Sequence, residues 1–148
     1  MQVDGQVTFA APADRVWEVL RDRDVLAKAI PGCESLEETA PGSYKASLKL
    51  GIAAVKGSYT ADVLISDERA PAHYRLKIAG QGGPGFVNME GDVDLSPQGE
   101  QTSVGYKFEV QVGGMIAAVG QRMLGGVGRM LAGDFFKAMQ KAAEGGAS

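Results

Sequence analysis

Hydrophobic and polar residues alternate with a period of two through most of the chain, which is the pattern of strands with one buried face. We expect strands over residues 1–9, 33–39, 43–50, 55–65, 72–80, 87–95 and 102–112. Short turns separate the last six, so consecutive strands should pair as antiparallel hairpins. Each strand has one polar side, so one face of the sheet should be wet and the other covered.

Two short stretches after the first strand have helical spacing instead. Pro12 fits the first turn of a helix whose apolar face includes Val16 and Leu20. We expect Asp24 to cap a second helix that ends at Ile30, because Pro31 and the glycine after it stop a helix.

The last long segment, residues 115–143, predicts an amphipathic helix of about seven turns. Its apolar face carries Ile116, Gly120, Leu124, Val127, Leu131, Phe135 and Ala138, and its opposite face carries Arg122, Arg129, Gly133, Lys137 and Gln140. This helix should cover the dry face of the sheet. The chain is therefore predicted to be an α+β protein, with a curved antiparallel sheet of about seven strands around one long C-terminal helix. We expect a single domain over residues 1–144 and a disordered tail over 145–148.

Glycine is unusually frequent in this last helix, at positions 120, 125, 126, 128 and 133. Five interior glycines would cost roughly 4–5 kcal/mol, against a total domain stability of about 5–15 kcal/mol. Either the helix approaches the sheet closely, or it is thin and adaptable above a ligand. Inward sheet positions are small as well, at Ala46, Ala61, Gly80 and Gly91. Small residues on both surfaces favour an apolar ligand cavity, with close packing as the alternative.

The expected cavity draws its walls from both the sheet and the helix. Its small, apolar and aromatic side chains would suit a flat or aliphatic molecule. The predicted lining is Ala46, Leu48, Tyr59, Ala61, Tyr74, Leu76, Met89, Gly91, Tyr106, Phe108, Ile116, Gly120, Met123, Leu124 and Val127.

Composition and charge exclude several classes of protein. The net charge of -3 and the pI near 5.2 argue against a nucleic-acid-binding protein, which would be basic. No signal peptide and no run of 18 apolar residues is present. Cys33 is the single cysteine and cannot form an internal disulfide, which fits a reducing compartment. We therefore expect a soluble, cytoplasmic domain.

Groups that could support catalysis are scarce. His73, the single histidine, should point outward into solvent, and Cys33 has no CxxC spacing. One histidine and one cysteine do not predict a metal site, and no catalytic residue or cofactor is expected. Glu90, Asp92 and Asp94 should form a solvated acidic stripe on the outer face.

Two alternatives to a ligand carrier remain open. Tyr59, Tyr74 and Tyr106 could donate protons in an enzyme of the cyclase or hydrolase kind. Separately, the basic residues Arg122, Arg129 and Lys137 could bind an acidic partner or anionic lipid, or could simply form a solvated helix face.

Several motifs resemble one known family. The chain opens with Ala-Pro-Ala-Asp-Arg-Val-Trp at 11–17 and Ile-Pro-Gly-Cys at 30–33, and later has Gln-Val-Gly-Gly at 111–114 and Leu-Ala-Gly-Asp-Phe-Phe at 131–136. Together these are similar to the CoxG family of carbon monoxide dehydrogenase subunits. That family lies in the START-like (SRPBCC), or helix-grip, superfamily, which also includes polyketide cyclases and lipid carriers.

The resemblance implies a function as well as a fold. It implies a non-catalytic accessory protein of a molybdenum-containing CO dehydrogenase or a related hydroxylase. The internal cavity would hold a quinone or a lipid. The protein would assist membrane recruitment, electron-acceptor delivery or enzyme maturation, in the cytoplasm or at the inner face of the cell membrane. A polyketide cyclase-like enzyme using the same pocket is the alternative.

Overall fold

The structure, a computed structural model, describes residues 1–52 and 55–145. Within these ranges the chain folds as an α+β protein with a sheet, two short helices, a 3-10 turn and one long helix. In chain order the elements are β1 (Gln2–Phe9), α1 (Ala13–Leu20), α2 (Arg23–Ala29), β2 (Cys33–Ala40), β3 (Ser43–Leu50), β4 (Gly57–Arg69), β5 (His73–Gly82), β6 (Gly85–Gln98), β7 (Gln101–Gly113), η2 (Met115–Val119) and α3 (Gln121–Gly145).

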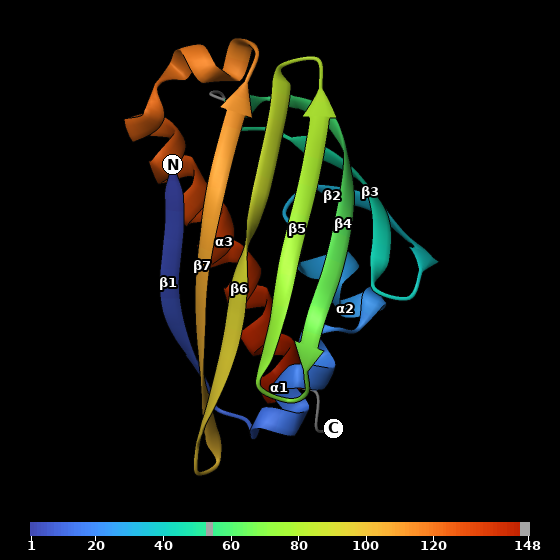
Figure 1. The fold of residues 1–148 in the computed structure, drawn as a ribbon, viewed down its shortest axis with the longest axis vertical. Coiled ribbons are helices and arrows are strands. Elements are labelled where there is room, and N and C mark those ends of the chain that lie inside the picture. Colours follow the sequence, from blue (N-terminus) through green and yellow to red (C-terminus); the bar gives the residue numbers. More distant parts are fainter. Residues whose placement is uncertain (53–54, 146–148) are drawn as a thin grey trace.

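One antiparallel sheet holds all seven described strands in the order β1-β7-β6-β5-β4-β3-β2 (Figure 1). From β2 to β7 each strand pairs with the next, which confirms the hairpins predicted from the alternation. β1 pairs with β7, so that Val3 lies opposite Phe108. The first two strands of the chain therefore form opposite edges of the sheet, and α1 and α2 connect them.

The long helix α3 lies across one face of the curved sheet (Figure 1). It begins near the end of β7 and runs to the end of the molecule where α1 lies. Phe136 and Met139 are buried among sheet residues such as Val93 and Val104, in the largest core cluster. This arrangement confirms the predicted helix-grip fold.

The segment predicted as one helix from residue 115 is in fact two pieces. Residues 115–119 form the 3-10 turn η2, and α3 begins at Gln121. Gly120 separates them with a φ of 96°, in the left-handed region that glycine adopts without a Cβ clash. Within α3 the buried stripe is Leu124, Gly125, Phe136, Met139 and Ala143, which lies beside the predicted one and shares Leu124 with it.

Two further boundaries differ from the prediction. Asp22 rather than Asp24 caps α2, because its carboxylate accepts hydrogen bonds from the backbone N–H groups of Asp24 (2.9 Å) and Val25 (3.2 Å). Gly145, expected in the tail, is the last residue of α3, and residues 146–148 lie outside the described residues.

Candidate ligand-binding site

The space between the sheet and α3 is densely packed at the end where α1 and α2 close it. Phe9, Leu20 and Met139 are completely buried there. Tyr74, one of the predicted lining residues, packs edge-on against Trp17 with the ring centroids 5.7 Å apart. This end of the interior is ordinary protein core.

A row of small side chains crosses the middle of the same inner face. Ala46 on β3 lies opposite Ala61 on β4, which in turn lies opposite Gly80 on β5. A Cβ built on Gly80 would meet its nearest side-chain atom, the Cβ of Ala61, at 3.8 Å, an ordinary contact distance. The glycine therefore leaves room at this position that a methyl group could fill.

Several apolar side chains that point inward keep contact with solvent. Leu76, Ile78 and Met89 occupy inner-face positions in register with the buried residues around them, yet each is only half-buried. On the opposite wall, Val127 and Phe135 of α3 are half-buried too. Apolar surface that faces inward but stays accessible is where an apolar ligand gains most from binding.

Gly91 is small for a different reason. A Cβ at this position would lie 2.6 Å from Cδ1 of Phe108 and would also collide with the carbonyl oxygen of Lys107. The Phe108 ring occupies the place of the missing side chain. At Gly91 the close-packing alternative therefore holds, and this residue is not a source of free volume.

A second, smaller core cluster gathers other predicted lining residues near η2. Tyr59, Ile116 and Leu124 are buried together with Val55, and Leu48 and Val127 pack against them among other partly buried residues. Ile116 is 2% exposed, so its side chain anchors η2 to the sheet. The structure thus brings sheet and helix residues together here as the sequence predicted.

Two predicted lining residues do not join the others. Met123 is 57% exposed on the outer side of α3. Gly120 is exposed as well, because it forms the junction between η2 and α3. Gly120 was placed inside on a continuous helical wheel, which the break at this residue interrupts, whereas Met123 precedes Leu124, which takes the inward position.

The three tyrosines are poorly suited to acid catalysis. Tyr59 donates its hydroxyl hydrogen to the backbone oxygen of Val55 at 2.6 Å, and burial raises its pKa. Burial also raises the pKa of Tyr74, which lies in the packed core. Tyr106 stacks on Phe136 at a centroid distance of 4.5 Å, and burial raises its pKa as well. A tyrosine with a raised pKa gives up its proton less readily.

The acidic stripe of Glu90, Asp92 and Asp94 is exposed on the outer face as expected, and it also takes part in a network of ion pairs. Arg75 contacts Glu90 at 2.9 Å and Asp92 at 3.2 Å, and His73 contacts Asp94 through Nδ1 at 2.7 Å. His73 does point outward, but its side chain is only 13% exposed, because the carboxylates of β6 cover it. The expectation of a freely solvated histidine is therefore wrong.

The remaining reactive groups form no recognisable centre. Cys33 donates its thiol hydrogen to the carbonyl oxygen of Ser35 at 3.3 Å, and burial raises its pKa, which makes the thiol less reactive. Among residues 1–52 and 55–145, no group of histidine, cysteine, aspartate and glutamate side chains could hold a metal ion. None of the helices described in those ranges is both long and apolar enough to cross a membrane.

Two open hollows mark the outer surface. One of about 530 Å³ is lined by Glu34, Ser47, Leu48, Ser58, Tyr59, Thr60, Gln81 and Gly82. The other, of about 490 Å³, is lined by Asp4, Gly5, Gln6, Asp94, Gly105, Tyr106 and Lys107. Polar and charged side chains line both, together with three residues of the predicted cavity, Leu48 and Tyr59 in the first and Tyr106 in the second.

The basic residues predicted to bind a partner all lie on the exposed side of α3. Arg122, Arg129 and Lys137 are exposed, and none of the ion pairs seen in the described part of the chain involves them. They follow the helix from its first turn to its second half.

The predicted cavity lining lacks some inner-face residues that the structure places in the same half-buried region. These are Val63, Ile78, Val87, Val112 and Phe135. The period of two already directs the first four inward, so their direction could be predicted. Their partial exposure could not be predicted, because it depends on where α3 crosses the sheet.

Comparison with known proteins gives a family and several solved structures that are similar to this chain. The sequence profile of the CoxG family of carbon monoxide dehydrogenase subunits matches residues 5–144. A conserved protein from Geobacillus kaustophilus of known structure is 46% identical, with 98% of this chain and 96% of that chain covered and a TM-score of 0.96. A search of curated proteins finds no match.

More distant structures share the fold. The Zhui aromatase/cyclase from Streptomyces sp. R1128 is 22% identical, with 97% of this chain and 93% of that chain covered and a TM-score of 0.72. A START superfamily protein from Mycobacterium smegmatis is 18% identical, with coverage of 97% and 94% and a TM-score of 0.68. At these identities the likeness extends to the fold alone.

Proposed function

Because the chain belongs to the CoxG family of carbon monoxide dehydrogenase subunits, we propose that it is a non-catalytic accessory protein that binds a hydrophobic molecule between its sheet and α3. The molecule is a quinone or a lipid. The partner is a molybdenum-containing CO dehydrogenase or a related hydroxylase in the cytoplasm. By carrying the ligand, the protein assists membrane recruitment, electron-acceptor delivery or maturation of that enzyme.

The half-buried inner face carries this proposal. Leu76, Ile78 and Met89 point inward and yet keep accessible surface. They lie beside the row of small residues that ends at Gly80. A ligand covering them would remove apolar surface from water at roughly 25 cal/mol per Å². The residues opposite Leu76 and Ile78 on the neighbouring strands are all uncharged, which suits a ligand whose body is apolar.

The state of the tyrosines supports a carrier over an enzyme. The hydroxyl of Tyr59 is committed to a backbone acceptor at 2.6 Å, and the pKa of each of Tyr59, Tyr74 and Tyr106 is raised by burial. Proton transfer needs a donor whose pKa lies near the working pH. These groups are shifted in the wrong direction.

Thermal unfolding with a soluble ubiquinone or menaquinone analogue tests the proposal. At a free concentration about 100 times the Kd, a ligand that binds only the folded state adds about 2.7 kcal/mol, which raises the Tm of a chain of this size by about 8 °C. Gly80→Leu places a side chain in the small row and should abolish the shift.

Ala79→Leu is the matched control. Ala79 is exposed on the other face of the same strand, so its enlargement should leave the ligand-induced shift unchanged. The Tm of each variant without ligand reports whether it folds. Absence of a shift in the wild type at saturating ligand, or equal loss in both variants, would overturn the interior site.

A further inference from the structure

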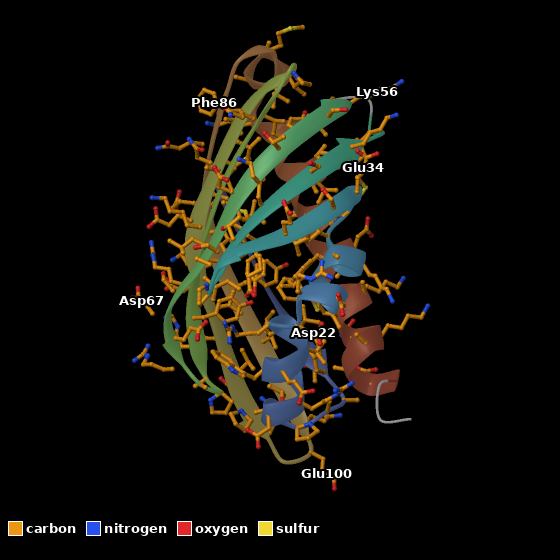
Figure 2. The ribbon with its side chains drawn as sticks, turned by 90° about the vertical axis from the view of Figure 1, so that its right-hand side faces the viewer. Asp22, Glu34, Lys56, Asp67, Phe86 and Glu100 are labelled. Atoms are coloured by element: carbon orange, nitrogen blue, oxygen red, sulfur yellow. The ribbon has the colours of Figure 1, made fainter. Side chains whose placement is uncertain are left out.

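One end of the molecule exposes large apolar side chains. Met115 is 78% exposed, Met123 57% and Phe86 44%. Ala117 and Ala118 in the same 3-10 turn are exposed too. We call these five residues the apolar tip. Figure 2 shows Phe86 near the end of the molecule opposite Glu100, and Figure 1 shows that η2 and the start of α3 lie at that end.

The apolar tip rests on a well-packed base. The backbone N–H of Ile116 donates to the carbonyl oxygen of Pro84 at 2.9 Å, and the Ile116 side chain is buried beneath η2. The Phe86 ring lies over Gly113, its partner in the β6–β7 ladder. Neighbouring side chains are therefore anchored while Met115 and Phe86 project outward, so their exposure does not come from fraying.

Charge is distributed unevenly with respect to this end. The connections that build it are three segments, residues 51–56, 83–84 and 114–120. These segments contain Lys56 and no acidic residue, and Lys49 and Arg122 lie two residues outside them. Lys56 lies at the same end as Phe86 in Figure 2, with Glu34 as the labelled acid nearest to it. Although the chain has a net charge of -3, lysine and arginine are thus the charged residues in and directly beside the connections that carry the apolar tip.

We propose that the apolar tip inserts into the surface of an anionic lipid bilayer, with Lys56 and Arg122 against the lipid headgroups. The inference rests on the proposed function, since a bilayer is where a quinone or lipid would be taken up or released. Apolar side chains flanked by lysine and arginine are the pattern of interfacial membrane binding. Flexible methionines adapt to a fluid surface.

The shape of this end favours lipid over a protein partner. Neither of the two hollows described above is lined by a residue of the apolar tip. A stable protein interface needs a complementary, well-packed surface, whereas projecting side chains need only a layer that they can enter.

Sedimentation with vesicles tests the inference. Wild-type protein should bind vesicles of phosphatidylcholine with about 30% phosphatidylglycerol, and binding should weaken as salt rises from about 50 to 500 mM. Lys56→Gln combined with Arg122→Gln should lower the partition coefficient about 30-fold, from about 1 kcal/mol for each basic residue near such a surface. Lys28→Gln with Lys141→Gln, two exposed residues outside the three segments, is the charge-matched control and should have little effect.

The apolar contribution has its own matched pair. Met115→Asp should abolish binding, whereas Leu64→Asp should not, because Leu64 is 42% exposed but points outward from the middle of β4. Unchanged melting temperatures show that both variants fold. Equal loss in the two variants, or no binding by the wild type, would overturn the inference. A third outcome would overturn it too: the wild type captures CO dehydrogenase but binds no vesicles, and Met115→Asp loses that capture. This result would assign the apolar tip to a protein partner.

Failure of this inference can be separated from failure of the proposed function. The quinone-analogue shift in Tm is measured without vesicles, and Met115→Asp should leave it intact. Vesicle binding without any quinone response would leave the tip as a membrane contact and remove the interior ligand. A quinone response without vesicle binding would support the interior ligand and overturn the membrane contact of the apolar tip.

Discussion

Helix α3 carries glycines at two positions where the structure shows no need for them. Gly126 and Gly133 are exposed, and a Cβ built on either would meet no atom within 4 Å. Alanine at each should therefore stabilise the helix by about 0.8–1 kcal/mol with no steric cost. Both substitutions together should raise the free energy of unfolding by about 2 kcal/mol, because the two sites are far enough apart to add.

Differential scanning calorimetry can measure this effect. For a chain of 148 residues, 1 kcal/mol corresponds to about 3 °C in Tm, so the double variant should melt about 6 °C higher. Gly128→Ala is the contrasting variant. Its Cβ would lie 3.2 Å from Cγ2 of Val3, so crowding against β1 should offset the gain in helix propensity.

The double variant also distinguishes the two explanations for the glycines. An unchanged or lower Tm would refute the reasoning from helix propensity. A higher Tm with an unaffected quinone response would show that the adaptable helix is not needed for binding. A higher Tm with weakened quinone binding would show that these glycines exchange stability for function.

Two further predictions concern the sheet. Gly91→Ala should lower the free energy of unfolding by about 1–3 kcal/mol in urea, because the new Cβ would lie 2.6 Å from the Phe108 ring and against the backbone of β7; stability within about 0.3 kcal/mol of wild type would contradict that contact. Burial raises the pKa of Tyr74 above its ordinary value near 10, so above about pH 10 this tyrosine ionises in the unfolded chain before it ionises in the folded one. The stability that the buried tyrosine contributes is therefore intact below about pH 10 and is lost as the pH rises further. Urea unfolding of Tyr74→Phe between about pH 9 and pH 11 should decline less steeply than the wild type, and parallel curves would refute the assignment.

The fold could be predicted from the sequence because the alternation is local and strict. Tyr44 and Ala46 on β3 point inward, and Lys45 points outward, as the pattern requires. The order from β2 to β7 followed from short turns, whereas the pairing of β1 with β7 did not. The long helix was harder, since its buried stripe depends on how α3 lies against the sheet. Its start was missed as well, because no property of the wheel shows that Gly120 adopts a φ of 96°.

The candidate site was predictable in its members but not in their roles. Small residues at positions 80 and 91 look the same in the sequence. In the structure one leaves room beside Ala61 and the other receives the Phe108 ring. The difference depends on the rotamer of a residue on the neighbouring strand, which is a tertiary property. His73 is a similar case, because its cover comes from carboxylates that lie on β6.

The pairing of β1 with β7 has a consequence for how the chain is made. Val3 leaves the ribosome more than a hundred residues before its partner Phe108, a delay of about 5–20 s at ordinary rates of translation. The other strands can pair with their neighbours as they emerge, but β1 must wait with its edge open. The outward side chains of β1 are Gln2, Asp4, Gln6 and Thr8, which make an exposed edge a poor template for aggregation during that interval.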